Sequence, residues 1–168
     1  MKEKILIAAV LAMFVTSAPL YAAERHTEIE GGFSYEIPAN WIVMEYPGLK
    51  FKIIITDPIG DFSPNMTLVD EKYAGNLKEY ELASIPNMKK SIPGFRILKK
   101  SQAKTLAGKV FRSVKYIHKA ESGVIIQTAN FLELKEGRKL VLTCTSPKGH
   151  EDKIEKSCNK VVRSLRVN

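Results

Sequence analysis

The chain has 168 residues and a formal net charge of +8, from 26 lysines and arginines against 18 aspartates and glutamates. This length predicts a single domain, and the lack of an internal repeat, low-complexity tract or interdomain linker argues against repeat and multidomain architectures. The positive charge favours nucleic acid, anionic lipid headgroups or acidic proteins as partners, or it serves only to keep a small domain soluble.

Residues 1–22 have the layout of a secretory signal peptide. Lys2 and Lys4 precede an unbroken apolar run of 11 residues, Ile5–Val15, and a short segment of small and polar residues follows. A membrane anchor is the alternative, but a spanning helix needs about 20 apolar residues. The first cysteine is Cys144, so none stands at the cleavage point to carry a lipid. We therefore expect a periplasmic or secreted protein that meets envelope surfaces and no nucleic acid.

A flexible lead is predicted over residues 23–32, which are mostly polar and end in two glycines. Residues 33–168 form the predicted domain. Phe33–Ile37 alternates apolar and polar side chains, the pattern of a half-buried strand. Further strands are expected over residues 41–46 and 51–56. The longest irregular loop, Asp57–Asn65, precedes a short strand at 66–69.

The first helix is predicted over Asn76–Ile92. Asn76 with Glu79 three residues on resembles a capping box. The apolar residues of one helical face are Leu77, Tyr80, Ile85, Met88 and Ile92. Pro86 lies inside this span. Because proline lacks an N–H and crowds the carbonyl four residues earlier, we expect a kink or a division into two pieces.

Four strands follow in meander order, over residues 95–104, 109–118, 124–134 and 139–145. Their connections are short and contain glycine, so neighbours should be antiparallel, because parallel strands need a crossover of a dozen or more residues. A polar helix with one apolar stripe should then lie on this sheet. The stripe consists of Ile154, Cys158, Val161, Val162 and Leu165.

This order of elements resembles the PsbP-like family, which includes a photosystem II subunit and exported bacterial proteins and shares its fold with a Ran-binding import factor. The resemblance covers nearly all of residues 33–166. It rests on Phe33–Trp41, on the turn Leu106–Gly108 before the strand that contains Tyr116, and on Val161–Leu165. It implies an α+β fold, namely an α/β/α sandwich around a mainly antiparallel sheet with a central meander and a C-terminal helix packed on it. It also implies protein binding rather than catalysis. No residue that binds a photosystem or Ran matches a position here.

Cys144 and Cys158 are the two cysteines of the chain, and both lie on predicted core faces. In an exported domain this favours a disulfide between the last strand and the last helix. Closing a loop of about 15 residues would stabilise the fold by roughly 3 kcal/mol. The alternative is two buried reduced thiols that are too far apart to bond. Without a Cys-x-x-Cys motif, a redox role is disfavoured.

No stretch carries a catalytic, cofactor or metal motif. His26, His118 and His150 lack metal-ligand spacing, and Asp57 and Asp61 lack the ligand spacing of an EF-hand. Neither a Gly-x-Ser-x-Gly elbow nor a phosphate-binding loop occurs. The sequence therefore predicts no cofactor, no metal site and no catalytic residue.

Two surfaces remain as candidates for binding. The 57–65 loop either displays Ile59 and Phe62 or folds them onto the core. The second surface is either a docking patch for an acidic or lipid partner or solvated charge, and it contains Lys89, Lys90, Arg96, Lys99 and Lys100.

We therefore predict a non-catalytic, PsbP-like binding or accessory protein of the bacterial envelope. Its partner would be an envelope protein or complex, with weak contact to an anionic membrane surface. The alternative is a small-ligand carrier or weak enzyme that uses a groove between sheet and helix. A deep apolar pocket with convergent polar groups would favour this alternative.

Overall fold

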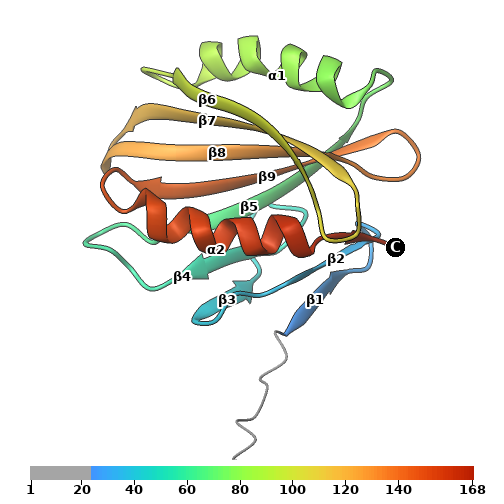
Figure 1. Cartoon of the computed structure of the whole chain (residues 1–168). Helices are drawn as coiled ribbons and strands as arrows, with labels where there is room; N and C mark the ends of the chain where they lie inside the picture. Colours follow the sequence, from blue (N-terminus) through green and yellow to red (C-terminus); the bar gives the residue numbers. More distant parts are fainter. Residues whose placement is uncertain (1–23) are drawn as a thin grey trace, which may run out of the picture.

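The computed structural model describes residues 24–168, which form two antiparallel sheets and two helices (Figure 1). The large sheet has the order β3-β4-β5-β9-β8-β7-β6, and the small sheet has the order β1-β2-β10. This confirms the predicted α+β class with a mainly antiparallel sheet. The predicted signal peptide, residues 1–22, lies outside the described residues.

The elements have the following bounds. The strands of the large sheet are β3 (Trp41–Met44), β4 (Ile53–Thr56), β5 (Asn65–Lys72), β6 (Arg96–Lys104), β7 (Val110–Ala120), β8 (Gly123–Glu133) and β9 (Arg138–Pro147). Those of the small sheet are β1 (Arg25–Glu28), β2 (Phe33–Glu36) and β10 (Arg166–Val167). The helices are α1 (Leu77–Ser91) and α2 (Glu151–Ser164).

The predicted meander is present, since β6, β7, β8 and β9 pair in sequence order. Its turns contain Gly108 and Gly137 at φ 81° and 70°, values that glycine adopts without steric cost. The meander does not occupy the middle of the sheet. It runs from β6 at one edge to β9 at the centre, and β5 pairs with the other side of β9 from Asn65↔Thr145 to Lys72↔Arg138.

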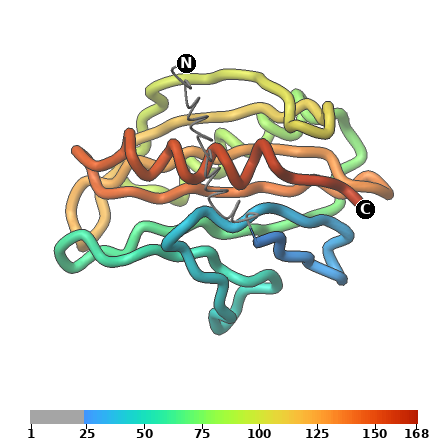
Figure 2. The backbone as a smooth tube through the Cα atoms, turned by 60° about the horizontal axis from the view of Figure 1, so that its bottom comes forward, coloured from blue at the N-terminus to red at the C-terminus, as the bar shows by residue number. Residues whose placement is uncertain are grey.

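Helix α2 covers one face of the sheet with its apolar stripe. All five residues of the predicted stripe are buried. They pack in the main core with alternate residues of β9, namely Leu140, Leu142 and Cys144. The small sheet extends the same core through Phe33 and Tyr35 of β2. Figure 2 shows α2 lying lengthwise along the strands.

Helix α1 packs on the opposite face, over β7 and β8. Tyr80 of α1 meets Phe131 of β8 edge to face, with ring centroids 5.8 Å apart. The next residue, Leu132, belongs to the core beneath α2. Because successive side chains of a strand point to opposite faces, the two helices lie on opposite sides of the sheet. The predicted capping box of Asn76 and Glu79 is present at the start of α1.

Helix α1 runs through Pro86 as one element, so the predicted division into two pieces is wrong. Pro86 and Leu82 are both exposed. Water can therefore reach this side of the helix, where the proline removes a backbone hydrogen bond. A kink at Pro86 stays a prediction.

The flexible lead predicted over residues 23–32 is wrong for residues 25–28. They form β1, which pairs with β2 from Arg25↔Glu36 to Glu28↔Phe33. Arg25 donates to the Glu36 carboxylate (2.8 Å) and to the carbonyl of Ser164 at the end of α2 (3.2 Å). Such a short polar segment shows no strand pattern in its own sequence. It becomes an ordered strand through contacts with residues outside the segment.

Candidate binding surfaces

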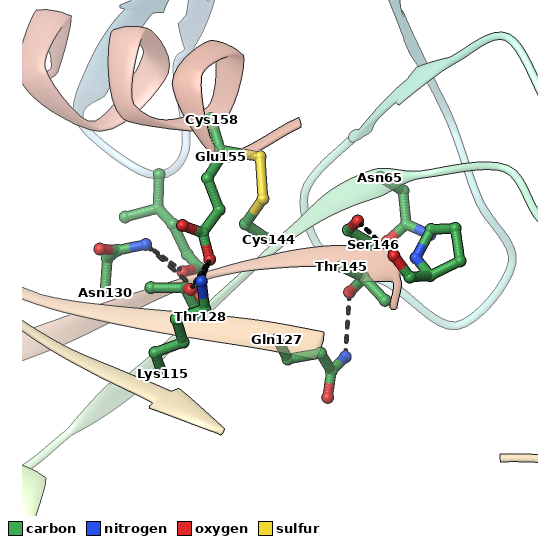
Figure 3. Close-up of a disulfide and its surroundings, with 12 residues drawn as sticks. Asn65, Lys115, Gln127, Thr128, Asn130, Cys144, Thr145, Ser146, Glu155 and Cys158 are labelled. Atoms are coloured by element: carbon green, nitrogen blue, oxygen red, sulfur yellow. Dashed lines mark hydrogen bonds and ion pairs between the residues drawn. A yellow bond between two sulfur atoms is a disulfide. The ribbon is translucent and has the colours of Figure 1, made fainter. Parts of the chain in front are cut away.

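A disulfide joins Cys144 of β9 to Cys158 of α2, as predicted (Figure 3). Their Cα atoms are 6.1 Å apart, and both residues are buried. Beside the bridge, Glu155 of α2 accepts a hydrogen bond from Thr128 (3.1 Å) and pairs with Lys115 (2.8 Å). Both thiols are consumed by the bond, so the pair is a structural link between helix and sheet.

The predicted 57–65 loop closes on itself. The backbone N–H of Ile59 donates to the carbonyl of Phe62 (2.7 Å), and the N–H of Phe62 donates back (3.2 Å). Gly60 stands at the tip with φ 60°, where glycine is favoured. Ile59 packs partly buried against the main core, and Phe62 is half-buried. The two side chains thus form no broad exposed apolar patch, and a binding role for them stays a prediction.

The five predicted basic residues are all exposed but do not form one patch. Lys89 and Lys90 stand in the last turn of α1. Lys100 lies 3.3 Å from the carboxylate of Glu81 on the α1 side of the sheet. Lys99 instead opposes Lys115, the partner of Glu155 on α2. Arg96 opposes Ile117 and so shares the α2 side with Lys99.

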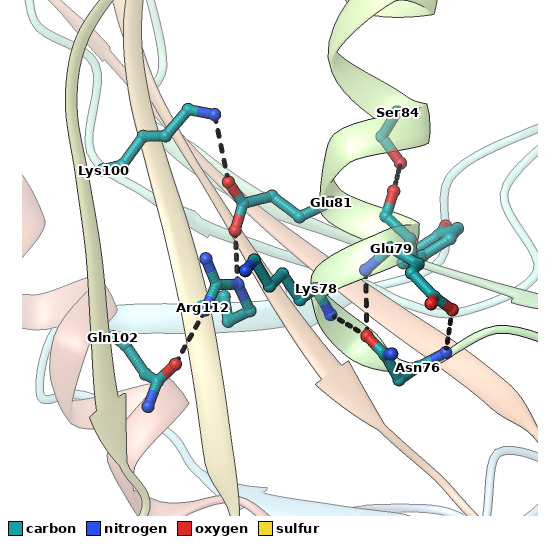
Figure 4. Close-up of polar contacts among 9 residues, drawn as sticks. Asn76, Lys78, Glu79, Glu81, Ser84, Lys100, Gln102 and Arg112 are labelled. Carbon is teal, nitrogen blue, oxygen red and sulfur yellow. Dashed lines mark hydrogen bonds and ion pairs between the residues drawn. The ribbon is translucent and has the colours of Figure 1, made fainter.

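Glu81 of α1 is a buried carboxylate that two cations neutralise (Figure 4). Arg112 of β7 donates to one oxygen at 2.5 Å, and Lys100 lies near the other. Arg112 also donates to Gln102 of β6 (2.7 Å). Because a buried charge is costly unless it is paired, Lys100 and Arg112 are committed to holding α1 on the sheet.

Asp70 of β5 carries a second carboxylate that is shielded from solvent, with 3% of its side chain exposed. It accepts hydrogen bonds from Lys50 and Arg138, both at 2.7 Å, and Arg138 also donates to the carbonyl of Gly31 (2.9 Å). Burial alone would raise the pKa of Asp70, but the hydrogen bonds and charges of Lys50 and Arg138 outweigh it and hold this pKa below its usual value. The cluster ties the segments around Lys50 and Gly31 to the large sheet.

These two segments form the walls of a groove of about 680 Å³, lined by residues 26–30 and by residues 45–52 except Gly48. Ile29 and Tyr46 are highly exposed, with 88% and 55% of their surface accessible. Phe51 of the second wall is buried in the main core, where its ring meets Phe33 edge to face at 5.2 Å, and the Lys50 ammonium lies 4.8 Å from its ring centre. The groove thus combines exposed apolar side chains with fixed charges.

Polar groups interact at the β1 wall, where His26 and Glu28 line the groove and Tyr35 of β2 is buried behind them. Nε2 of His26 lies 3.1 Å from Oε1 of Glu28, and the hydroxyl of Tyr35 donates to the same oxygen (3.5 Å). Burial and then the charge of Glu28 raise the pKa of Tyr35 well above its usual value, so Tyr35 stays a neutral donor. Among residues 24–168, no group of three His, Cys, Asp or Glu side chains is placed to hold a metal ion.

The sequence prediction missed this groove because it assigned one wall to a flexible lead. The only sequence signal was Tyr46, an aromatic residue beside the turn at Pro47-Gly48. A second hollow, of about 720 Å³, lies between the start of α1 and the neighbouring strand ends. Its lining is mostly polar or charged, and includes Lys78, Gln102, Lys109, Arg112 and Glu133. It is not the deep apolar pocket that a small-ligand carrier would need.

Comparison with known proteins gives a fold and no close relative. No family model matches the chain, and no curated protein is similar to it in sequence. Cyanobacterial PsbP from Synechocystis sp. PCC 6803 superposes with a TM-score of 0.61 over 92% of this chain and 99% of its own, at 13% identity. The chain has the PsbP fold.

Two further structures share the PsbP fold. LpqN of Mycobacterium tuberculosis, which is involved in cell envelope biogenesis, has a TM-score of 0.64 and 14% identity over 89% of this chain and 86% of its own. The Ran-binding protein Mog1p of Saccharomyces cerevisiae has a TM-score of 0.56 and 11% identity over 87% of this chain and 95% of its own. At these identities the likeness concerns the fold alone.

Proposed function

We propose that this protein is a non-catalytic binding or accessory protein of the bacterial envelope, an exported domain of the PsbP type with an α/β/α sandwich. The groove between residues 26–30 and 45–52 carries the proposal. Its exposed Ile29 and Tyr46 stand beside charged residues of both signs, including Glu28 and Lys50. An apolar and aromatic centre with a polar rim is the composition of a protein-binding site.

The position of β1 supports an extended partner segment. β1 is an outer strand of the small sheet, so one of its edges has no strand partner within residues 24–168. An exposed strand edge can pair with an extended peptide through backbone hydrogen bonds, while pockets beside it receive alternate side chains. The adjoining groove would supply such contacts through Ile29 and Tyr46.

Two observations favour the envelope as the place of action. The disulfide supports an oxidising compartment, because such bonds form and persist outside the cytosol. LpqN, which shares the fold, is involved in cell envelope biogenesis. No helix within residues 24–168 is long and apolar enough to cross a membrane.

Crosslinking in the envelope followed by mass spectrometry tests the proposal. The wild-type protein should capture a defined protein partner. The Ile29→Asp/Tyr46→Ala variant should capture it about tenfold less, because loss of an interface anchor costs at least 1–2 kcal/mol. Leu82→Asp, at an exposed apolar residue on α1, is the matched control and should leave capture unchanged. Equal capture by the groove variant and wild type, with both folded by thermal unfolding, would contradict the proposal.

A further inference from the structure

We infer that the outer face of α2 is a docking surface for anionic lipid headgroups. This surface is separate from the groove, and the inference does not depend on what the groove binds. It rests on the arrangement of four cations, on their lack of acidic partners, and on an exposed leucine beside them.

The four cations are Lys153, Lys156, Lys160 and Arg163, and all are exposed. At 3.6 residues per turn they fall within an arc of about 80°, centred roughly opposite the buried stripe. At 1.5 Å per residue they extend over about 15 Å of helix. Because the buried stripe faces the sheet, these side chains point away from the body of the protein. Figure 1 shows α2 on the outside of the sheet, with this face uncovered by any other labelled element.

These cations are not used to hold the fold together. None of the four takes part in an ion pair within residues 24–168. Glu155, an acidic residue of the same helix, is turned toward the sheet and pairs with Lys115. Lys99 and Arg96 of β6 face the same side of the molecule as α2 and add to its positive charge. Asp152, the exposed acidic residue of α2, makes no ion pair with them, so the outer face presents a net positive charge to its surroundings.

The composition of this face fits a lipid surface better than a protein partner. Protein interfaces are depleted in lysine and have aromatic and apolar residues at their centre. No aromatic or apolar side chain interrupts the four cations on the outer arc of α2. Long cationic side chains in a row suit an array of phosphates without fixed positions, and each cation near an anionic bilayer strengthens binding roughly fivefold.

Leu106 adds an apolar contact at one end of this face. It stands in the turn between β6 and β7, and its N–H donates to the carbonyl of Arg163 (2.6 Å). This bond ties the turn to the end of α2, while 73% of Leu106 stays exposed. An apolar side chain beside a row of cations is the pattern of surfaces that rest at the boundary between headgroups and acyl chains.

Vesicle co-sedimentation of the exported protein tests the inference. Binding is expected to vesicles that contain phosphatidylglycerol, to weaken with added salt, and to be lost with vesicles of phosphatidylcholine alone. The variant Lys153→Gln/Lys156→Gln/Lys160→Gln should bind about 100-fold more weakly, from three fivefold losses. The variant Lys78→Gln/Lys89→Gln/Lys90→Gln removes three exposed lysines of α1. It should bind within about threefold of wild type, because those charges lie on the opposite face.

Three outcomes would overturn the inference. An equal loss of vesicle binding in the two triple variants would mean that the net charge of the protein, and not the α2 face, drives binding. Binding to both vesicle types alike would rule out recognition of anionic headgroups. No vesicle binding, together with loss of a crosslinked acidic protein in the α2 variant, would assign the face to a protein. The Ile29→Asp/Tyr46→Ala variant should bind vesicles as wild type does, so failure of the groove proposal stays distinguishable.

Discussion

The two helices cover opposite faces of the same sheet and both pack apolar side chains on it, but they differ in depth of burial and in the link that reinforces the packing. α2 is held by five buried residues of an apolar stripe and by a disulfide. On α1 only Tyr80 and Glu81 are fully buried, while Leu77, Ile85 and Met88 pack partly buried against a second apolar cluster. Tyr80 donates to Glu71 (2.5 Å), and Glu81 is held by Arg112 and Lys100. Burial first, and then the bond to Glu71, raise the pKa of Tyr80 well above its usual value, so this donor stays protonated.

This difference decides which cations are free to bind a partner. Under α1, Lys100 and Arg112 neutralise a buried carboxylate and so belong to the fold. On α2, apolar contacts and the disulfide secure the inner face, and the four outer cations make no ion pair with any residue of 24–168. A cluster of basic residues in the sequence therefore does not identify a functional surface, because only the pairing of each charge shows whether it is available.

Removing the disulfide should weaken the attachment of α2 most strongly. The Cys144→Ala/Cys158→Ala variant is expected to lose about 3 kcal/mol of unfolding free energy, because the unfolded chain gains the freedom of a loop of about 15 residues. Urea denaturation monitored by circular dichroism measures this loss. Wild-type protein treated with a thiol reductant is the control and should show a similar loss. Unchanged midpoints in both samples would mean that the bridge is not formed.

Neutralising Glu81 should weaken the attachment of α1 by a smaller amount. Glu81→Gln is expected to cost about 2 kcal/mol, because Arg112 then loses a charge-assisted hydrogen bond in a largely buried setting. The same denaturation experiment measures it, with the exposed Glu121→Gln as control. A double-mutant cycle with Arg112→Gln should show coupling between the two residues. Simple additivity would indicate that the pair contributes nothing specific.

The capping box of α1 should have the smallest effect. Asn76→Ala is expected to cost about 1 kcal/mol, because the side chain no longer accepts from the backbone N–H groups of Lys78 and Glu79. Asn87→Ala changes the same residue type at an exposed position inside the helix, where an effect within about 0.5 kcal/mol is expected. Hydrogen exchange at the first turn of α1 should quicken only in Asn76→Ala, and equal changes in both variants would refute the capping role.

Features of the fold that depend on local pattern could be read from the sequence. The spacing of Ile154, Cys158 and Val161 predicted the buried side of α2, and with it the partner of Cys144. Short glycine-containing connections predicted the meander, and Asn76 with Glu79 predicted the capping box. Each of these signals lies within a few residues, where helical and strand periodicities determine which side chains share a face.

The candidate sites could be predicted only in small part. The outer cations of α2 are visible in the sequence at positions 153, 156, 160 and 163, but nothing local distinguishes them from Lys99 and Lys100. The groove was not predicted at all, because its two walls come from segments that are separate in sequence. The pair of Asp70 and Arg138, which are 68 residues apart in the chain, brings these walls together. Asp70 binds Lys50 of one wall, and Arg138 binds Gly31 at the end of the other.

The sequence alone thus determined the helices, most strands, the meander and the disulfide, because these follow from local periodicity and turn chemistry. Only the tertiary structure decided that β5 pairs with β9, that residues 25–28 form a strand, and that two distant segments enclose a groove. It also decided which lysines and arginines form ion pairs. These features depend on hydrogen bonds and ion pairs between distant residues. No local pattern encodes such contacts, because they form only when the sheet has assembled. Burial of a charged side chain is then costly unless the charge is paired.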